Sequence, residues 1–181
     1  MRGGILDWRR ATAIAGSFDQ ADAAHARRSA SASRVAAFLA AHSKVSEVFH
    51  PSLPTHRDAD AVARHYVRHG SLLSFRVAGA DEDRTRHLAD VLATCTVVRY
   101  ALSFDGVATK VNHHRTVSEY FTPAPELRRS GFDRLIRLAI GLEDPDDLIA
   151  VLNWTLHHGD RVTADDLARW QTSRAAELGI R

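Results

Sequence analysis

Short apolar segments alternate with amphipathic segments of helical length along most of the chain. Four of the short segments have the length and the alternating apolar pattern of β-strands: Val45–Phe49, Leu72–Val77, Thr96–Leu102 and Leu135–Leu142. Segments with helical spacing of apolar residues separate and flank them: 19–42, 58–67, one starting at Asp81, 145–158 and 163–179. Because helices and short strands of similar bulk must share one core, the order predicts an α+β fold. We expect a two-layer sandwich with a four-stranded, mainly antiparallel sheet.

Local signals mark where the last two helices begin and end. Asp144-Pro145-Asp146-Asp147 combines an N-cap acid, proline at the first helical position and acids in the first turn. Gly159 ends that helix, and Thr163 begins the next, which is expected to run to Gly179. The segment 103–131 contains the breakers Pro123, Pro125 and Gly131 and is predicted to be irregular.

The length of 181 residues suits one domain with appendages. We predict a domain over 19–160, preceded by an N-terminal segment, 1–18, that docks on a partner, and followed by an extra C-terminal helix, 161–181. The one cysteine, Cys95, excludes an internal disulfide. No apolar run approaches the roughly 20 residues that cross a bilayer, and no signal peptide is recognised, so we expect a cytoplasmic protein without a membrane partner.

Charge and histidine content favour neither nucleic-acid binding nor a metal site. The net charge is +2 and the pI is about 9.0, but the arginines are scattered among acidic residues instead of forming a basic stripe. Eleven histidines are present, and none falls in a recognised ligand spacing with carboxylates or with Cys95. We therefore expect no metal and no nucleic acid.

Five segments resemble the C-terminal part of the Cys/Met metabolism PLP-dependent enzymes, the cystathionine synthase and lyase family. Residues 38–45 resemble the family's FLEAHPKV, residues 50–56 its YPGLPSH, and residues 70–75 its GGMLSF. Residues 103–107 stand where the family has SLGGV, and residues 137–149 are similar to its RLSVGIEDVDDLI. Each match alone is weak, but the five occur in the family's order with compatible spacing.

The resemblance implies the small C-terminal domain of a fold-type I PLP enzyme, without the larger domain that carries the cofactor lysine. The chain has two lysines, Lys44 and Lys110, and the resemblance assigns neither to the cofactor. Both are expected to be solvated surface residues. PLP chemistry needs such a lysine, so the resemblance implies that pyridoxal phosphate is held mainly by a partner chain.

The resemblance also implies four substrate-binding residues. Arg137 lies within an apolar strand, where a guanidinium needs an anion. From the residue alone, we expect a salt bridge to an acidic side chain. The resemblance implies another partner, because in the family this arginine holds the substrate α-carboxylate. Ser103 matches the serine of the family's SLG loop, and its alternative is a capping role. Leu102 precedes it and disfavours a cationic distal group. Ser118 keeps a hydroxyl where the family has threonine.

Three hypotheses remain open from the sequence. In the first, a separate chain supplies the PLP domain, two copies of each chain assemble, and the enzyme performs elimination or replacement at Cβ or Cγ of an amino acid. In the second, the domain is a non-catalytic regulatory or structural descendant. In the third, from a different class, it binds nucleic acid through its arginines.

Overall fold

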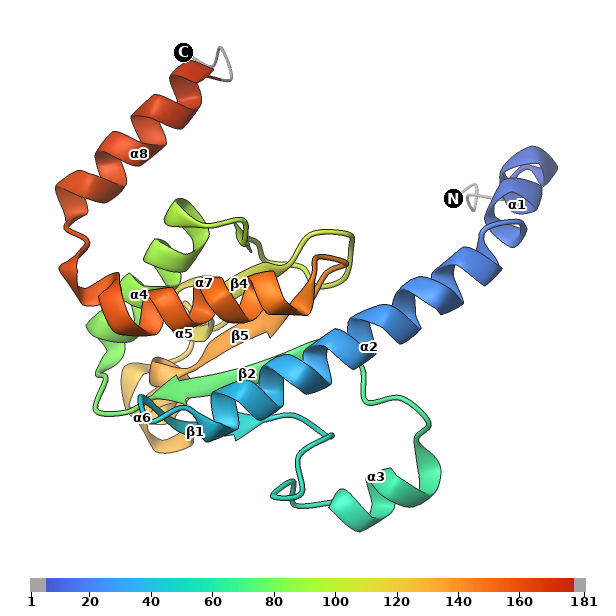
Figure 1. The fold of residues 1–181 in the computed structure, drawn as a ribbon, viewed down its shortest axis with the longest axis horizontal. Coiled ribbons are helices and arrows are strands. Elements are labelled where there is room, and N and C mark those ends of the chain that lie inside the picture. The colour runs from blue at the N-terminus through green and yellow to red at the C-terminus, as the bar shows by residue number, and fades with distance from the viewer. Residues whose placement is uncertain (1–5, 178–181) are drawn as a thin grey trace.

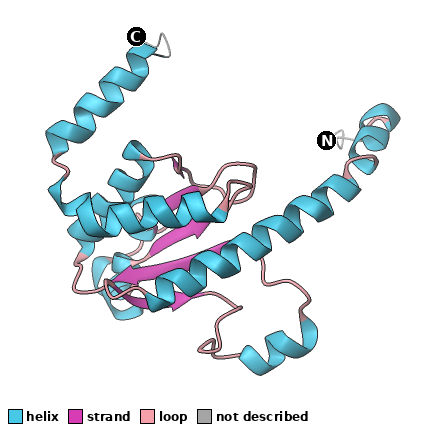
Figure 2. Cartoon of the chain, viewed as in Figure 1, coloured by secondary structure: helices cyan, strands magenta, loops and turns pink. Residues whose placement is uncertain are grey.

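The computed structural model describes residues 6–177, which form one sheet and the helices around it (Figures 1 and 2). The elements in chain order are α1 (Trp8–Ala15), α2 (Phe18–Ala41), β1 (Val45–Phe49), α3 (Ala59–His65), β2 (Leu72–Val77), α4 (Glu82–Cys95), β3 (Arg99–Tyr100), β4 (Lys110–His113), α5 (His114–Val117), α6 (Ala124–Ser130), β5 (Ile136–Ala139), α7 (Pro145–His158) and α8 (Ala164–Glu177), with two short 3₁₀ turns at Phe132–Arg134 and Gly159–Arg161.

The sheet has the strand order β1-β2-β5-β4-β3. All neighbouring strands are antiparallel except β3 and β4, which are parallel. The register places Ser74, Arg137 and Asn112 in one row across β2, β5 and β4. The predicted α+β class and the mainly antiparallel sheet are confirmed.

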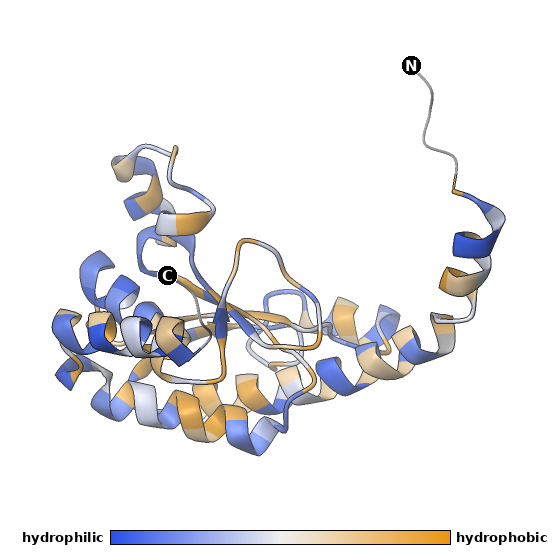
Figure 3. Ribbon diagram, turned by 90° about the horizontal axis from the view of Figure 1, so that it is seen from above, coloured by the Kyte–Doolittle hydropathy of each residue, from blue (hydrophilic) through white to orange (hydrophobic). Residues whose placement is uncertain are grey.

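One face of the sheet carries the hydrophobic core. Strand β2 alternates as the period-2 pattern requires, with Leu73, Phe75 and Val77 buried. Helices α2, α4 and α7 pack on this face through apolar residues such as Leu39 and Leu92. Figure 3 shows the apolar stretches of the strands and of the helices that cover them. Residues such as Arg137 therefore point away from these three helices.

The sheet has five strands, whereas four were predicted. The additional strand is β4, which lies in the segment 103–131 that was expected to be irregular. Its sequence Lys-Val-Asn-His has one apolar residue, so no alternation is visible, although Asn112 and His113 are buried. The same segment contains α5 and α6. The predicted strand 96–102 is reduced to Arg99–Tyr100. The loop that follows it leads to β4 and has positive φ angles at Asp105 and Gly106.

The two ends of the described chain extend from the domain in different directions (Figure 1). Helix α1 buries no residue, and Trp8 and Phe18 are 70% and 66% exposed. Helix α8 contacts α4 and also buries no residue. The predicted end of the last helix at Gly179 lies outside the described residues, as do residues 1–5. The division into 1–18, 19–160 and 161–181 stays a prediction.

Candidate functional site

Arg137 is a half-buried cation without an acidic partner among the described residues. It is the second residue of β5, and its Nη2 donates to the backbone oxygen of Leu102 at 2.8 Å. The guanidinium carbon lies 5.5 Å from the ring centroid of Phe104. Burial lowers the pKa of Arg137, and no carboxylate opposes that shift. The salt-bridge interpretation is therefore wrong for the described part of the chain, and the guanidinium keeps donors for an external anion.

The loop that carries Ser103 lies against Arg137, and cations from three elements bind its backbone. Besides Arg137, Lys110 of β4 donates to the backbone oxygen of Asp105, and Arg28 of α2 donates to that of Gly106 at 3.1 Å. The Nζ of Lys110 also lies 3.4 Å from the Oγ of Ser103. The structure thus brings together Arg137, Leu102 and Ser103, as the resemblance implied.

Arg28 and Lys110 were not predicted as parts of the site. Arg28 also lies 3.4 Å from the Asp105 carboxylate, and its side chain is 15% exposed. Arg28, Lys110 and Arg137 thus contribute three cations around the loop, and Asp105 is the acid that lies next to one of them. No spacing rule could identify Arg28, which is 78 residues from the loop residue that it binds.

The end of the loop is fixed by a buried hydrogen-bond network with Glu143. The Thr109 amide donates to Oε1 of Glu143 at 2.6 Å, and the Thr109 hydroxyl donates to Oε2 at 2.8 Å. The same hydroxyl accepts from the Gly141 amide at 2.9 Å. A Cβ at Gly141 would lie 2.5 Å from the Val107 oxygen, so glycine is needed for this close approach. The Arg-Leu-Ala-Ile-Gly-Leu-Glu segment therefore provides both Arg137 and the anchor of the Ser103 loop.

Ser118 lies next to this site through Asn112. The amide nitrogen of Asn112 donates to the Oγ of Ser118 at 3.1 Å. Asn112 faces Arg137 across the β4–β5 pair. The role of Ser118 in substrate binding stays a prediction, and Asn112 is a site residue that the sequence analysis missed.

Exposed apolar side chains lie on the loop that carries Ser103 and on the segment that follows Ser118. On the 102–107 loop, Leu102 is 71% and Val107 is 73% exposed. On the segment after Ser118, Tyr120 and Phe121 are each 71% exposed. Large apolar groups so close to a polar site are typical of a surface that is covered by another protein surface.

Both lysines of the chain are partly exposed, and each donates to a backbone oxygen. Lys44 donates to the Leu156 oxygen at 2.9 Å, and Lys110 donates to the Asp105 oxygen. A PLP imine needs a lysine amine that is free to react. That neither Lys44 nor Lys110 is the cofactor lysine stays a prediction.

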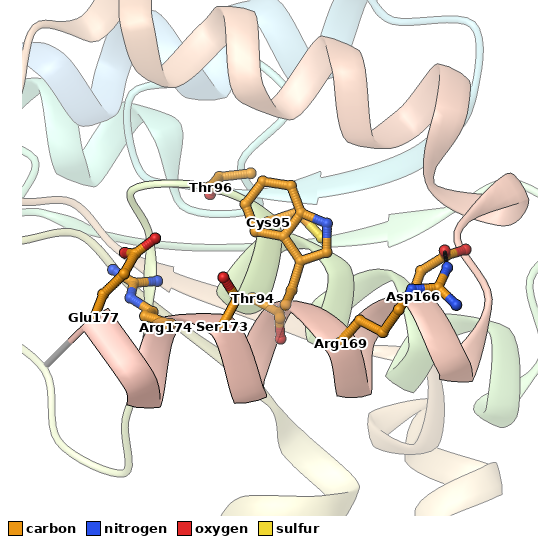
Figure 4. A pocket seen from close by; sticks show the side chains of 9 residues that line it. Thr94, Cys95, Thr96, Asp166, Arg169, Ser173, Arg174 and Glu177 are labelled. Carbon is orange, nitrogen blue, oxygen red and sulfur yellow. Dashed lines mark hydrogen bonds and ion pairs between the residues drawn. The ribbon is translucent and has the colours of Figure 1, made fainter. Parts of the chain in front are cut away.

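A separate cavity of about 690 Å³ lies between the end of α4 and α8 (Figure 4). Two of its four charged residues, Asp166 and Arg169, form an ion pair with each other. Burial and Asp166 raise the pKa of the Cys95 thiol, which stays protonated at neutral pH. The cavity therefore lacks an activated nucleophile.

Other classes of site find no support in the described part of the chain. Within residues 6–177, no group of three or more His, Cys, Asp or Glu side chains could hold a metal ion. No helix in this range is long and apolar enough to cross a membrane. Several arginines that could form a basic surface are instead paired with acids, as in Arg34–Asp146 and Arg84–Asp160.

Comparison with known proteins identifies the family. Residues 24–157 match the model of the Cys/Met metabolism PLP-dependent enzymes, and the chain belongs to this family. Cystathionine gamma-synthase of Mycobacterium tuberculosis is 33% identical over 130 residues, which are 72% of this chain and 32% of that protein. The Escherichia coli enzyme of the same name is 33% identical over 129 residues, 70% of this chain and 32% of that protein.

Comparison with solved structures gives matches to enzymes of the same family. Cystathionine gamma synthase of Xanthomonas oryzae in complex with cystathionine matches with a TM-score of 0.68 and 27% identity, over 78% of this chain and 36% of that chain. A putative O-acetylhomoserine (thiol)-lyase of Campylobacter jejuni, with a pyridoxyl-lysine monophosphate, matches with a TM-score of 0.67 and 26% identity, over 75% of this chain and 32% of that chain. This chain spans about a third of the length of the curated relatives.

Proposed function

We propose that this chain is the small subunit of a split, heteromeric PLP-dependent enzyme of the cystathionine synthase and lyase type. It supplies the part of the active site that holds the α-carboxylate of the amino-acid substrate. A separate chain supplies the PLP domain and the cofactor lysine. The assembled enzyme, for which we propose a cytoplasmic location, performs elimination or replacement at Cβ or Cγ.

The observation that carries the proposal is the state of Arg137. A half-buried guanidinium that is bonded to one backbone oxygen and to no described carboxylate is costly to maintain. A carboxylate that binds it in bidentate geometry compensates this cost and orients the substrate. The Ser103 loop next to it is held rigidly by Arg28, Lys110 and the Glu143 network, as expected for a preorganised site.

The exposed apolar residues near the site support the second part of the proposal. In the relatives, which are about three times as long, the matched segment is one part of a larger protein. Leu102, Val107, Tyr120 and Phe121 would pack against the PLP domain, and Trp8 and Phe18 of the N-terminal segment would extend that contact. An interface that replaces a covalent domain junction should bury more than roughly 2,000 Å² in total. Two copies of each chain, related by a two-fold axis, are the expected assembly.

Co-expression tests the proposal directly. The partner to use is a chain of roughly 200–250 residues, the size of one large domain, that contains the PLP lysine and is encoded by a neighbouring reading frame. Size-exclusion chromatography with light scattering should show co-elution, and the complex should show the cofactor's visible absorbance.

A pair of variants controls for non-specific association. Val107→Asp, on the 102–107 loop that carries Ser103, should weaken the complex. Val67→Asp, at a residue that is 97% exposed on the connection between α3 and β2, should leave it intact. A stable monomer that ignores the PLP-domain chain would contradict the proposal and favour the non-catalytic alternative.

A further inference from the structure

Asn112 is a buried amide with one unused hydrogen-bonding atom. The residue is 1% exposed. Its nitrogen donates to Ser118, while its oxygen Oδ1 has no hydrogen-bond partner among the described residues. Buried polar atoms are nearly always paired, because an unpaired one loses the interactions it has with water in the unfolded chain. An unpaired buried oxygen beside a binding site therefore suggests a partner that is bonded in another state.

The sheet places Asn112 beside Arg137. The two residues are direct partners in the antiparallel β4–β5 ladder, so their side chains leave the same face. In such a pair the Cβ atoms are about 4.5–5.5 Å apart. The side chains of an asparagine and an arginine can reach each other over this distance.

The donor count of Arg137 leaves room for this contact. A guanidinium has five N–H donors. In the structure one of its nitrogens donates to Leu102, and a substrate carboxylate would accept two further bonds in a bidentate pair. Donors remain for a third acceptor on the side of β4, where the free oxygen of Asn112 lies.

We propose that Asn112 is a positioning residue for Arg137: when a carboxylate binds, Oδ1 of Asn112 accepts a guanidinium N–H and fixes the plane of the guanidinium. Ser118 contributes by holding the amide nitrogen, which leaves the oxygen free to accept from Arg137. This inference rests on the proposed function, because it assumes that Arg137 binds a carboxylate. It gives Ser118 an indirect role, through Asn112.

The first test uses the unaltered chain, so folding of a variant is not a concern. Acetate is titrated into the isotope-labelled protein, and NMR follows the side-chain amide of Asn112 and the Nε of Arg137. We expect both signals to shift with the same apparent dissociation constant. A response of Arg137 alone would overturn the role of Asn112 and leave the proposed function standing. No response of either would contradict carboxylate binding by Arg137 itself.

A second test depends on the sign of a pKa shift. In Asn112→Asp, a carboxyl group replaces the amide. If Arg137 is within reach, the pKa of the new carboxyl group falls below the ordinary value of about 3.9, whereas burial alone raises it. Carbon-13 NMR of the isolated chain measures this pKa, and the double variant Asn112→Asp/Arg137→Met should reverse the shift.

A matched control uses the opposite neighbour of Arg137. Ser74 faces Arg137 on β2 in the same row and has no proposed role. Ser74→Ala should leave the acetate response of Arg137 unchanged, and Asn112→Leu should weaken it at least several-fold. A raised pKa in Asn112→Asp that does not depend on Arg137, or equal effects of Ser74→Ala and Asn112→Leu, would overturn the inference.

Discussion

Replacing Thr109 with valine should weaken the anchor that holds the end of the Ser103 loop to the rest of the domain. Valine keeps the shape of threonine but removes the hydroxyl. That hydroxyl donates to Glu143 at 2.8 Å and accepts from the Gly141 amide at 2.9 Å, and Thr109 is 1% exposed. The change therefore leaves a buried backbone N–H and one carboxylate oxygen without their partner.

The expected cost follows from these two bonds. A buried group that loses its partner costs about 1–3 kcal/mol, and more when it is charged. Glu143 is partly exposed and keeps its bond to the Thr109 amide, so its share is at the low end. We expect the free energy of unfolding to fall by about 2–4 kcal/mol.

Urea denaturation at pH 7 of the unaltered chain, of Thr109→Val and of a control variant measures this loss in the free energy of unfolding. The matched control is Thr155→Val in α7: Thr155 is also buried, but its hydroxyl donates only to the Val151 oxygen of its own helix. Its removal leaves no backbone N–H unpaired and should cost less than about 1 kcal/mol. Equal losses for the two variants would refute the anchoring role of Thr109.

Three further predictions concern other parts of the domain. Burial lowers the pKa of His50 to about 4, so His50 stabilises the fold fully above pH 6.5, and this stability is lost as the pH falls toward 4. The free energy of unfolding falls by about 3 kcal/mol over this pH range. His50→Gln should remove this part of the pH dependence of stability. His65→Gln, which changes an exposed histidine, should retain it. Gly141→Ala should destabilise the fold by several kcal/mol or prevent folding, since its Cβ would overlap the Val107 oxygen, and circular dichroism would detect this. Arg137→Met should leave the melting temperature of the isolated chain unchanged or raise it, because it removes a half-buried charge without an acidic partner among the described residues; a large loss of stability would show that Arg137 is structural.

Elements with strong local signals could be predicted from the sequence. Strands β1 and β2 begin and end at the predicted residues, and α7 begins at Pro145 as the Asp144 cap indicated. The class and the mainly antiparallel sheet followed from these elements. Strand β4 could not be predicted, because His113 is buried through hydrogen bonds to Thr116 and to the Asp133 oxygen, and hydropathy treats it as an exposed residue.

The residues of the candidate site also divide into those that the sequence indicated and those that it did not. The sequence indicated Arg137 because an arginine within an apolar strand conflicts with local hydropathy, and it indicated Leu102 and Ser103 through the family motif. Arg28 and Asn112 were missed, because their significance arises only when α2 and β4 come to lie against the loop and β5. Long-range contacts of this kind leave no mark in local spacing.

In the proposed enzyme, Arg137 holds the substrate α-carboxylate in a site that a PLP-domain chain completes. The most direct measurement titrates the reconstituted complex with L-cystathionine and follows the cofactor's visible absorbance, with Arg137 intact and in the Arg137→Met variant. Losing a charge-assisted bidentate contact costs about 2–4 kcal/mol, so the dissociation constant should rise roughly 30- to 1,000-fold. A ligand without the α-carboxylate should bind both forms equally. If L-cystathionine binds both forms with the same dissociation constant, Arg137 does not hold the carboxylate, which contradicts the proposed function.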